Sequence, residues 1–180
     1  MQRDPAYMIR LEEFTNNDFD RFINWIDDEK FMYQFAGPVF KFPITAEQLT
    51  DYISDKNRKA FKVVEIETEK VIGHGEIGRI DLKNKNARLC RILIADKDKR
   101  NKGFGALIIN ELLKIGFATL KLHRLDLGVF DFNKSAIRCY EKCGFKIEGL
   151  LRESFVIDDE FLSVYNMSIL KSEWEKMQNN

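Results

Sequence analysis

Residues 100–105 read Arg-Asn-Lys-Gly-Phe-Gly, and they run directly into a segment with apolar residues at helical spacing. A short strand follows, and residues 133–145 then read Asn-Lys-Ser-Ala-Ile-Arg-Cys-Tyr-Glu-Lys-Cys-Gly-Phe. The first stretch predicts a glycine turn at the start of a helix. The second predicts a helix that ends at Gly144, because glycine best tolerates a left-handed helix end.

Hydrophobic periodicity extends this pattern over most of the chain, with period two for strands and a spacing of three and four for helices. The predicted strands cover residues 8–14, 61–67, 71–80, 87–95, 122–130, 145–157 and 161–170. The predicted helices cover residues 17–28, a segment starting at 45, 104–117 and 133–143, with a broken aromatic connection over 31–43 and a polar tail after 170. This order predicts a mixed sheet with helices on both faces.

Composition limits the classes of protein. A chain of 180 residues with 44% hydrophobic residues predicts one domain, 1–180, with its core at about 8–170. The 29 basic residues balance 29 acidic ones, so no nucleic acid or membrane partner is expected. No apolar run reaches the roughly 20 residues of a bilayer span. No hydrophobic signal segment follows residues 1–5, which favours the cytoplasm.

The glycine turn is also a candidate binding site for an anion. A helix N-terminus presents unpaired N–H groups and partial positive charge, and Arg100 and Lys102 add charge beside it. Taken alone, the turn is equally compatible with tight strand-to-helix packing. It lacks the Gly-x-x-x-x-Gly-Lys-Ser/Thr pattern of a nucleotide P-loop.

Taken together, the two stretches resemble the acetyl-CoA core of the GNAT N-acetyltransferase superfamily. Residues 100–105 resemble its Arg/Gln-x-x-Gly-x-Gly/Ala pyrophosphate loop, and residues 133–145 its Asn-x-x-Ala…Tyr-x-x-x-Gly-Phe segment. Residues 144–152 are similar to the branch of ribosomal-protein N-terminal and spermidine acetyltransferases. The resemblance implies an α/β (α+β) GNAT fold. Its sheet would be mixed and mostly antiparallel, with about seven strands and splayed central parallel strands at 87–95 and 122–130.

The same resemblance implies acetyl-CoA as cofactor and no metal. The expected cofactor contacts lie on the first splayed strand, the glycine loop and the start of the tyrosine helix: Leu93, Ile94, Ala95, Arg100, Asn101, Lys102, Gly103, Phe104, Gly105, Ala106, Asn133, Ser135 and Ala136.

Two residues are candidates for catalysis. Tyr140 stands where the family keeps a general acid, and a hydroxyl with an ordinary pKa near 10 can protonate a thiolate whose ordinary pKa is near 8.5. Without the loop, its apolar helical neighbours would favour a core tyrosine. The strand glutamate of several relatives is missing, since that position falls at or beside Cys90. Glu76 is the nearest candidate base, and a solvated strand residue is the alternative.

The acceptor side is less specific. Aromatic residues at Trp25, Phe31, Tyr33 and Phe35 would form a wall around an amine or, equally, a plug over the sheet. The predicted function is direct acetyl transfer from acetyl-CoA, in a ternary complex, to a small-molecule amine or a protein N-terminus. The competing hypotheses are a catalytically silent acyl-CoA-binding module and a nucleotide-binding regulator. An exposed strand of the C-terminal hairpin could pair between subunits in a homodimer.

Overall fold

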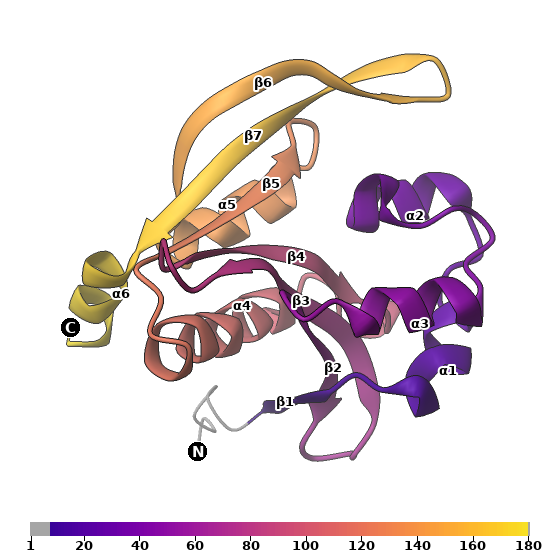
Figure 1. The fold of residues 1–180 in the computed structure, drawn as a ribbon, viewed down its shortest axis with the longest axis horizontal. Coiled ribbons are helices and arrows are strands. Elements are labelled where there is room, and N and C mark those ends of the chain that lie inside the picture. Colours follow the sequence, from indigo (N-terminus) through magenta and orange to yellow (C-terminus); the bar gives the residue numbers. More distant parts are fainter. Residues whose placement is uncertain (1–7, 180) are drawn as a thin grey trace.

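The computed structural model describes residues 8–179, so the N-terminal residues used for the expectation about localisation lie outside it. Seven strands form one sheet in the order β1-β2-β3-β4-β5-β7-β6 (Figure 1). Only β4 and β5 pair in parallel. The strands are β1 (Ile9–Glu13), β2 (Lys59–Glu65), β3 (Val71–Asp81), β4 (Asn86–Ile94), β5 (Arg124–Phe130), β6 (Lys146–Ile157) and β7 (Glu160–Leu170). The predicted mixed, mostly antiparallel sheet is confirmed.

Helices cover both faces of this sheet and enclose two hydrophobic cores. The helices are α1 (Phe19–Asn24), α2 (Glu29–Ala36), α3 (Ala46–Ser54), α4 (Phe104–Lys114), α5 (Lys134–Lys142) and α6 (Lys171–Gln178). One core lies between the sheet and α4 and α5, and the other joins α1, α2 and α3. Figure 1 shows α1–α3 gathered at one side and the β6–β7 hairpin arching over the sheet. In residues 8–179, no helix is long and apolar enough to cross a membrane.

The central strands separate as the resemblance implied. β4 and β5 pair only from Asn86 to Arg88, and beyond that point the edge of β4 is left without β5. β4 also carries a bulge, because its register with β3 shifts between His74 and Glu76 and Arg91 adopts a φ of 49°. An extra residue reverses which face later side chains occupy. Accordingly, Leu89 packs in the α4 core, whereas Leu93 packs in the α1–α3 core.

Three predicted elements were wrong. The first helix is shorter than 17–28, since α1 ends at Asn24. The supposedly broken aromatic segment contains α2, which begins because the Asp28 carboxylate accepts a hydrogen bond from the N–H of Phe31 at 2.6 Å. The supposed polar tail contains α6, where the carboxylate of Glu173 accepts from the N–H of Leu170 at 3.0 Å. In both helices, an acidic side chain that accepts from a backbone N–H stabilises the first turn, although the apolar pattern of the segment is too weak to predict a helix.

Candidate active site

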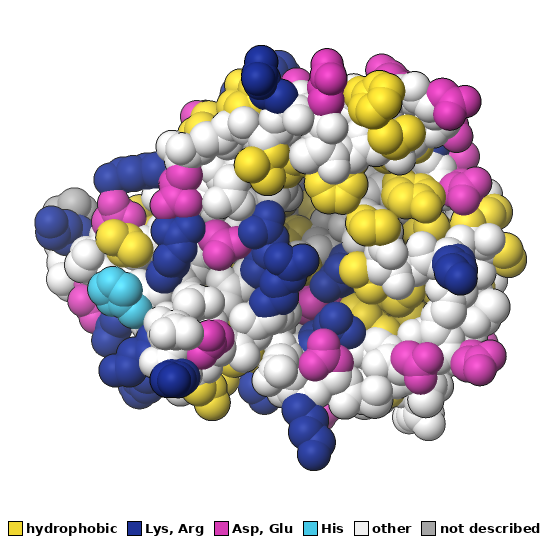
Figure 2. Space-filling model, turned by 45° about the horizontal axis from the view of Figure 1, so that its top comes forward, with side chains coloured by type: hydrophobic (Ala, Val, Ile, Leu, Met, Phe, Trp, Pro, Cys, Tyr) yellow, Lys and Arg dark blue, Asp and Glu magenta, His cyan; other side chains and the backbone are white. Residues whose placement is uncertain are grey.

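A cavity of about 1260 Å³ opens where β4 and β5 separate. Figure 2 shows it as a hollow bordered by Lys and Arg side chains in dark blue, with hydrophobic side chains close by. Residues of α2, β3, β4, β5 and β7 line it, together with the start of α4 and one face of α5. The cavity therefore brings together the two stretches that dominate the sequence.

The glycine turn forms one end of the cavity. Asn101 and Gly103 adopt positive φ values of 60° and 87°, and α4 begins directly after them at Phe104. Within residues 8–179, no hydrogen bond uses the backbone N–H groups of residues 101–105. Five consecutive donors at a helix N-terminus fit the pyrophosphate of coenzyme A, because the unpaired N–H groups and the helix dipole both favour an anion.

Arg100 connects this turn to the rest of the site. Its Nε donates to the carbonyl oxygen of Ile94 at 3.0 Å. The carbon at the centre of its guanidinium lies 5.5 Å from the centre of the Phe31 ring, within the range of a cation–π contact. Arg100 thus joins the loop, β4 and α2.

Ten of the thirteen expected cofactor contacts line the cavity: Leu93, Ile94, Arg100, Asn101, Gly103, Gly105, Ala106, Asn133, Ser135 and Ala136. The other three, Ala95, Lys102 and Phe104, do not line it with their side chains, and their contacts with the cofactor stay predictions. The N–H of Ala95 is used by the carbonyl of Ile72 at 2.9 Å. The Phe104 side chain is buried in the α4 core, and Lys102 is exposed.

The helix α5 begins at a tight cap. The side-chain oxygen of Asn133 accepts from the N–H of Ala136 at 3.2 Å and from the hydroxyl of Ser135 at 3.1 Å. This leaves the amide NH₂ of Asn133 as the polar group available to the cavity. The cap fixes the start of the helix on which Tyr140 lies, two turns further along.

Tyr140 is half-buried and lines the cavity. Its ring packs edge-on against Phe145, with 6.0 Å between the ring centres. Its hydroxyl makes no hydrogen bond with any residue in the range 8–179, yet no buried side-chain polar atom there is left unpaired. The hydroxyl oxygen is therefore open to the cavity. Burial raises the pKa of Tyr140 above its ordinary value, so the group stays protonated at neutral pH.

Glu76 lies on the opposite wall and is fully buried. Both of its carboxylate oxygens accept hydrogen bonds from Arg91. Arg58 adds a hydrogen bond through Nε at 3.0 Å, and the hydroxyl of Tyr52 donates another. The carbonyl of Arg91 in turn accepts from Nδ1 of His74 at 3.0 Å. The network thus holds the bulged residue of β4 by both its side chain and its backbone.

These contacts set the charge states. Burial would raise the pKa of Glu76, but the hydrogen bonds and charge of Arg91 outweigh it and hold that pKa below its ordinary value. Burial lowers the pKa of His74 to about 4, so its ring is neutral at pH 7. Glu76 lines the cavity, as a base should, but a paired carboxylate with a lowered pKa is a weak proton acceptor. Its role as base stays a prediction, and the geometry weighs against it.

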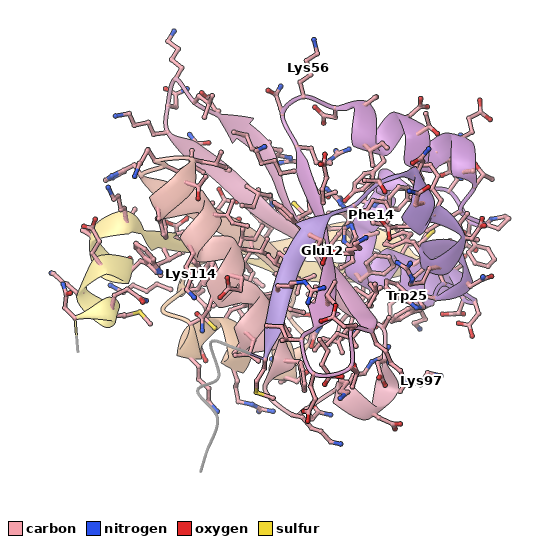
Figure 3. The ribbon with its side chains drawn as sticks, turned by 90° about the horizontal axis from the view of Figure 1, so that it is seen from below. Glu12, Phe14, Trp25, Lys56, Lys97 and Lys114 are labelled. Carbon is pink, nitrogen blue, oxygen red and sulfur yellow. The ribbon has the colours of Figure 1, made fainter. Side chains whose placement is uncertain are left out.

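The aromatic segment divides between two surroundings. Phe31 and Phe35, on α2, line the cavity. Trp25 instead packs against Phe22 in the α1–α3 core, and Tyr33 packs toward Phe130 and its neighbours. Figure 3 shows Trp25 on the side of the molecule formed by α1–α3. Neither Trp25 nor Tyr33 lines this cavity, because Trp25 lies at the end of α1 and Tyr33 points to another face of α2 than Phe31 and Phe35, and their role in acceptor binding stays a prediction.

Several cavity residues were not expected from the sequence. Four are arginines of the α3–β2 turn, β3 and β4: Arg58, Arg79, Arg88 and Arg91. The signal available was the recurrence of arginine at 88 and 91 within an otherwise apolar strand. The register of β3 with β4 brings these arginines together around Glu76, and this register cannot be predicted from the local sequence pattern.

Comparisons with known proteins agree with this geometry. The family model of the acetyltransferase (GNAT) domain matches residues 9–146. Spermidine N(1)-acetyltransferase of Vibrio cholerae is 33% identical over 86% of this chain and 88% of its own.

Two solved structures of spermidine N-acetyltransferase from Vibrio cholerae are also similar. One, in complex with CoA and spermine, has a TM-score of 0.81 and 27% identity, covering 93% of this chain and 98% of that one. The other, a dodecameric structure in an intermediate state, has a TM-score of 0.75 and 28% identity, covering 93% and 96%. A silent acyl-CoA-binding module is not favoured by these matches.

Proposed function

The chain belongs to the GNAT acetyltransferase family and is an acetyl-CoA-dependent N-acetyltransferase, and we propose that its amine acceptor attacks the thioester directly while both substrates are bound. Acetyl-CoA supplies the activated acetyl group. The open N–H groups of residues 101–105 hold its pyrophosphate. The unpaired edge of β4 near Leu93 and Ile94 accepts its pantetheine arm like an added strand.

The observation that carries the mechanism is the hydroxyl of Tyr140, which is protonated, open to the cavity and without a hydrogen bond to any residue from 8 to 179. A departing thiolate needs a proton donor, and a hydroxyl with a raised pKa holds its proton until such a base forms beside it. We assign Tyr140 as the general acid.

Glu76 and Arg91 have a different task in this scheme. Their buried ion pair fixes the β4 bulge, which in turn sets the direction of the main-chain groups between Cys90 and Leu93. We assign Glu76 as a positioning residue. An N–H near Leu93, held in this way, polarises the acetyl carbonyl.

The acceptor is an amine. The similar proteins named above acetylate spermidine, and one of them binds spermine. Polyamines are therefore the first acceptors to assay here. A protein N-terminus as acceptor and a homodimer as assembly stay predictions.

The mechanism is tested by measuring thiol release from acetyl-CoA with purified Tyr140→Phe. Loss of the acid should lower kcat at least about 100-fold. Binding of desulfo-CoA, followed by calorimetry, should stay unchanged. Tyr33→Phe is the matched control and should keep full activity, because Tyr33 does not line the cavity. A Tyr140→Phe enzyme with near-normal kcat would remove Tyr140 from the mechanism.

A further inference from the structure

The charges that line the cavity are mostly positive. Its lining contains seven basic side chains and two acidic ones, Asp55 and Glu76. Three of the basic groups, Arg100, Arg138 and Lys142, come from the glycine turn and α5, beside the pyrophosphate site. The other four come from the α3–β2 turn, β3 and β4, on the side where an acceptor must enter. We call this side the acceptor half.

The direction of Arg88 follows from strand alternation. Its neighbours Ala87 and Leu89 pack in the core beneath α4, so the Arg88 side chain points to the opposite face of the sheet. There its Nη1 donates hydrogen bonds to Oδ1 of Asp126 on β5 at 2.5 Å and to Oδ1 of Asn166 on β7 at 3.3 Å. Arg88 therefore lies on the face away from α4 and α5, where the acceptor half is.

No carboxylate of the acceptor half is open to a cationic ligand. Glu76 is held by Arg91 and Arg58. Asp55 pairs with Arg58 at 3.2 Å, and Asp126, just outside the lining, pairs with Arg88. A polyamine carries several ammonium groups, each of which needs a carboxylate or carbonyl partner. The described lining offers no such carboxylate that lacks an arginine.

By contrast, two arginines of the acceptor half keep guanidinium donors that no carboxylate uses: all those of Arg79, and two of those of Arg88, which is already paired with Asp126. Arg79 is exposed, and its side chain has no hydrogen-bond or ion-pair partner within residues 8–179. The hydrogen bonds that Arg88 makes to Asp126 and Asn166 both use Nη1, which leaves Nη2 and Nε as donors. The two arginines lie on neighbouring strands, since Gly78 is directly opposite Arg88 in the β3–β4 register.

We propose that the acceptor is a primary amine that also carries an anionic group, a carboxylate or a phosphate, held by Arg79 and Arg88. The guanidinium fork matches both anions through paired N–H donors. Binding the anion on β3 and β4 fixes the acceptor beside the point where β4 and β5 separate, with its amine directed to the thioester. This inference rests on the acetyltransferase function proposed above and names its class of acceptor.

The experiment compares matched acceptors in a thiol-release assay with the full chain. Ornithine is compared with putrescine, glucosamine 6-phosphate with glucosamine, and spermidine is included in the same series. In each pair, the acceptor that carries the anion should have a kcat/KM at least about tenfold higher than the one that lacks it. A factor of about ten is what one hydrogen bond to a charged group contributes. The two pairs distinguish a carboxylate from a phosphate.

Variants locate the effect. Arg79→Gln and Arg88→Gln should raise KM for the acceptor that carries the anion about 10- to 100-fold. KM for the matched amine that lacks the anion should stay within about twofold. Arg124→Gln, on β5, is the matched control and should leave the acceptor KM unchanged, because Arg124 lies outside the cavity lining and pairs with Glu148.

The outcomes separate the two proposals. If spermidine has a higher kcat/KM than every anionic acceptor, or if the arginine variants lower both members of a pair equally, the anion site is overturned and the acetyltransferase function stands. If no amine is acetylated although desulfo-CoA binds, both proposals are overturned.

Discussion

The two walls of the cavity carry polar groups in opposite states. On the β3–β4 wall, Glu76 is fully buried and accepts hydrogen bonds from Arg91, Arg58 and Tyr52. On the α5 wall, the hydroxyl of Tyr140 has no partner in residues 8–179 and opens to the cavity. A buried group whose hydrogen bonds are all satisfied contributes to the structure, whereas a polar group left unpaired at a cavity is available for chemistry. The walls should therefore respond differently to substitution.

The largest expected effect is on the charged wall. Glu76→Ala leaves Arg91 and Arg58 without their shared buried partner, which should lower the free energy of unfolding by about 3–5 kcal/mol. Glu148→Ala is the matched control, since Glu148 also pairs with an arginine, Arg124, but its side chain is 41% exposed. Loss of the Glu148–Arg124 pair should lower the free energy of unfolding by about 0–1 kcal/mol. Urea unfolding measures both, and equal losses would remove the structural role assigned to Glu76.

The next effect is a pH dependence from the same wall. The pKa of His74 is about 4 in the folded chain against an ordinary 6.5, so below pH 6.5 the unfolded chain binds a proton that the folded chain does not. Stability is then complete above about pH 6.5 and falls as the pH drops toward 4. Between pH 7.5 and 5 the loss should be about 2 kcal/mol.

Urea midpoints at these two pH values measure that loss. His74→Asn, which keeps a donor for the carbonyl of Arg91, should flatten the pH dependence. His123→Gln, at the other histidine of the chain, should leave it unchanged. A flat profile in the unsubstituted protein would show that His74 is not held neutral by burial.

A smaller effect is expected at the glycine turn, which joins the two walls. Gly103 has a φ of 87°, and a Cβ there would meet no atom within 4 Å, so Gly103→Ala adds backbone strain of about 1 kcal/mol without a clash. Because the strain distorts the open N–H groups, affinity for desulfo-CoA should fall about tenfold.

Gly37→Ala is the control for strain alone. Gly37 also has a positive φ, 61°, and open space, and its substitution should destabilise at least as much. It should leave desulfo-CoA affinity nearly unchanged, because Gly37 lines the cavity from the end of α2, donates its N–H to the carbonyl of Tyr33, and supplies none of the open N–H groups of residues 101–105. Equal loss of affinity in both variants would mean that general destabilisation, not the turn, is measured.

The part of this site that could be predicted from sequence is the part with local causes. The glycine turn and the end of α5 at Gly144 (φ 90°) follow from residues that allow positive φ. Tyr140 is singled out by the resemblance of residues 133–145 to the GNAT family segment.

The charged wall could not be predicted in the same way. The pairing of Glu76 with Arg91 depends on which residues of β3 and β4 face each other, and the bulge at Arg91 changes that register. Only the folded sheet decides it. The helix α2 was missed for a different reason, since one cap at Asp28 stabilises a segment whose aromatic residues favour strands.

The smallest expected change in stability belongs to the residue with the largest expected effect on chemistry. Tyr140→Phe removes a hydroxyl that makes no hydrogen bond within the described part of the chain, residues 8–179, so the free energy of unfolding should change by less than about 0.5 kcal/mol. Tyr52→Phe is the matched control, because the Tyr52 hydroxyl donates to the buried carboxylate of Glu76. Its removal should cost about 1.5–3 kcal/mol.

Urea unfolding of these two variants compares the walls with the same atom deleted from each. If Tyr140→Phe proved as destabilising as Tyr52→Phe, the Tyr140 hydroxyl would be a structural group, and a fall in kcat in that variant could no longer be assigned to a lost proton donor. If Tyr140→Phe is stable but has a low kcat, whereas Tyr52→Phe is destabilised, the two roles are separated: the Tyr140 hydroxyl then serves catalysis, and the Tyr52 hydroxyl serves the stability of the fold.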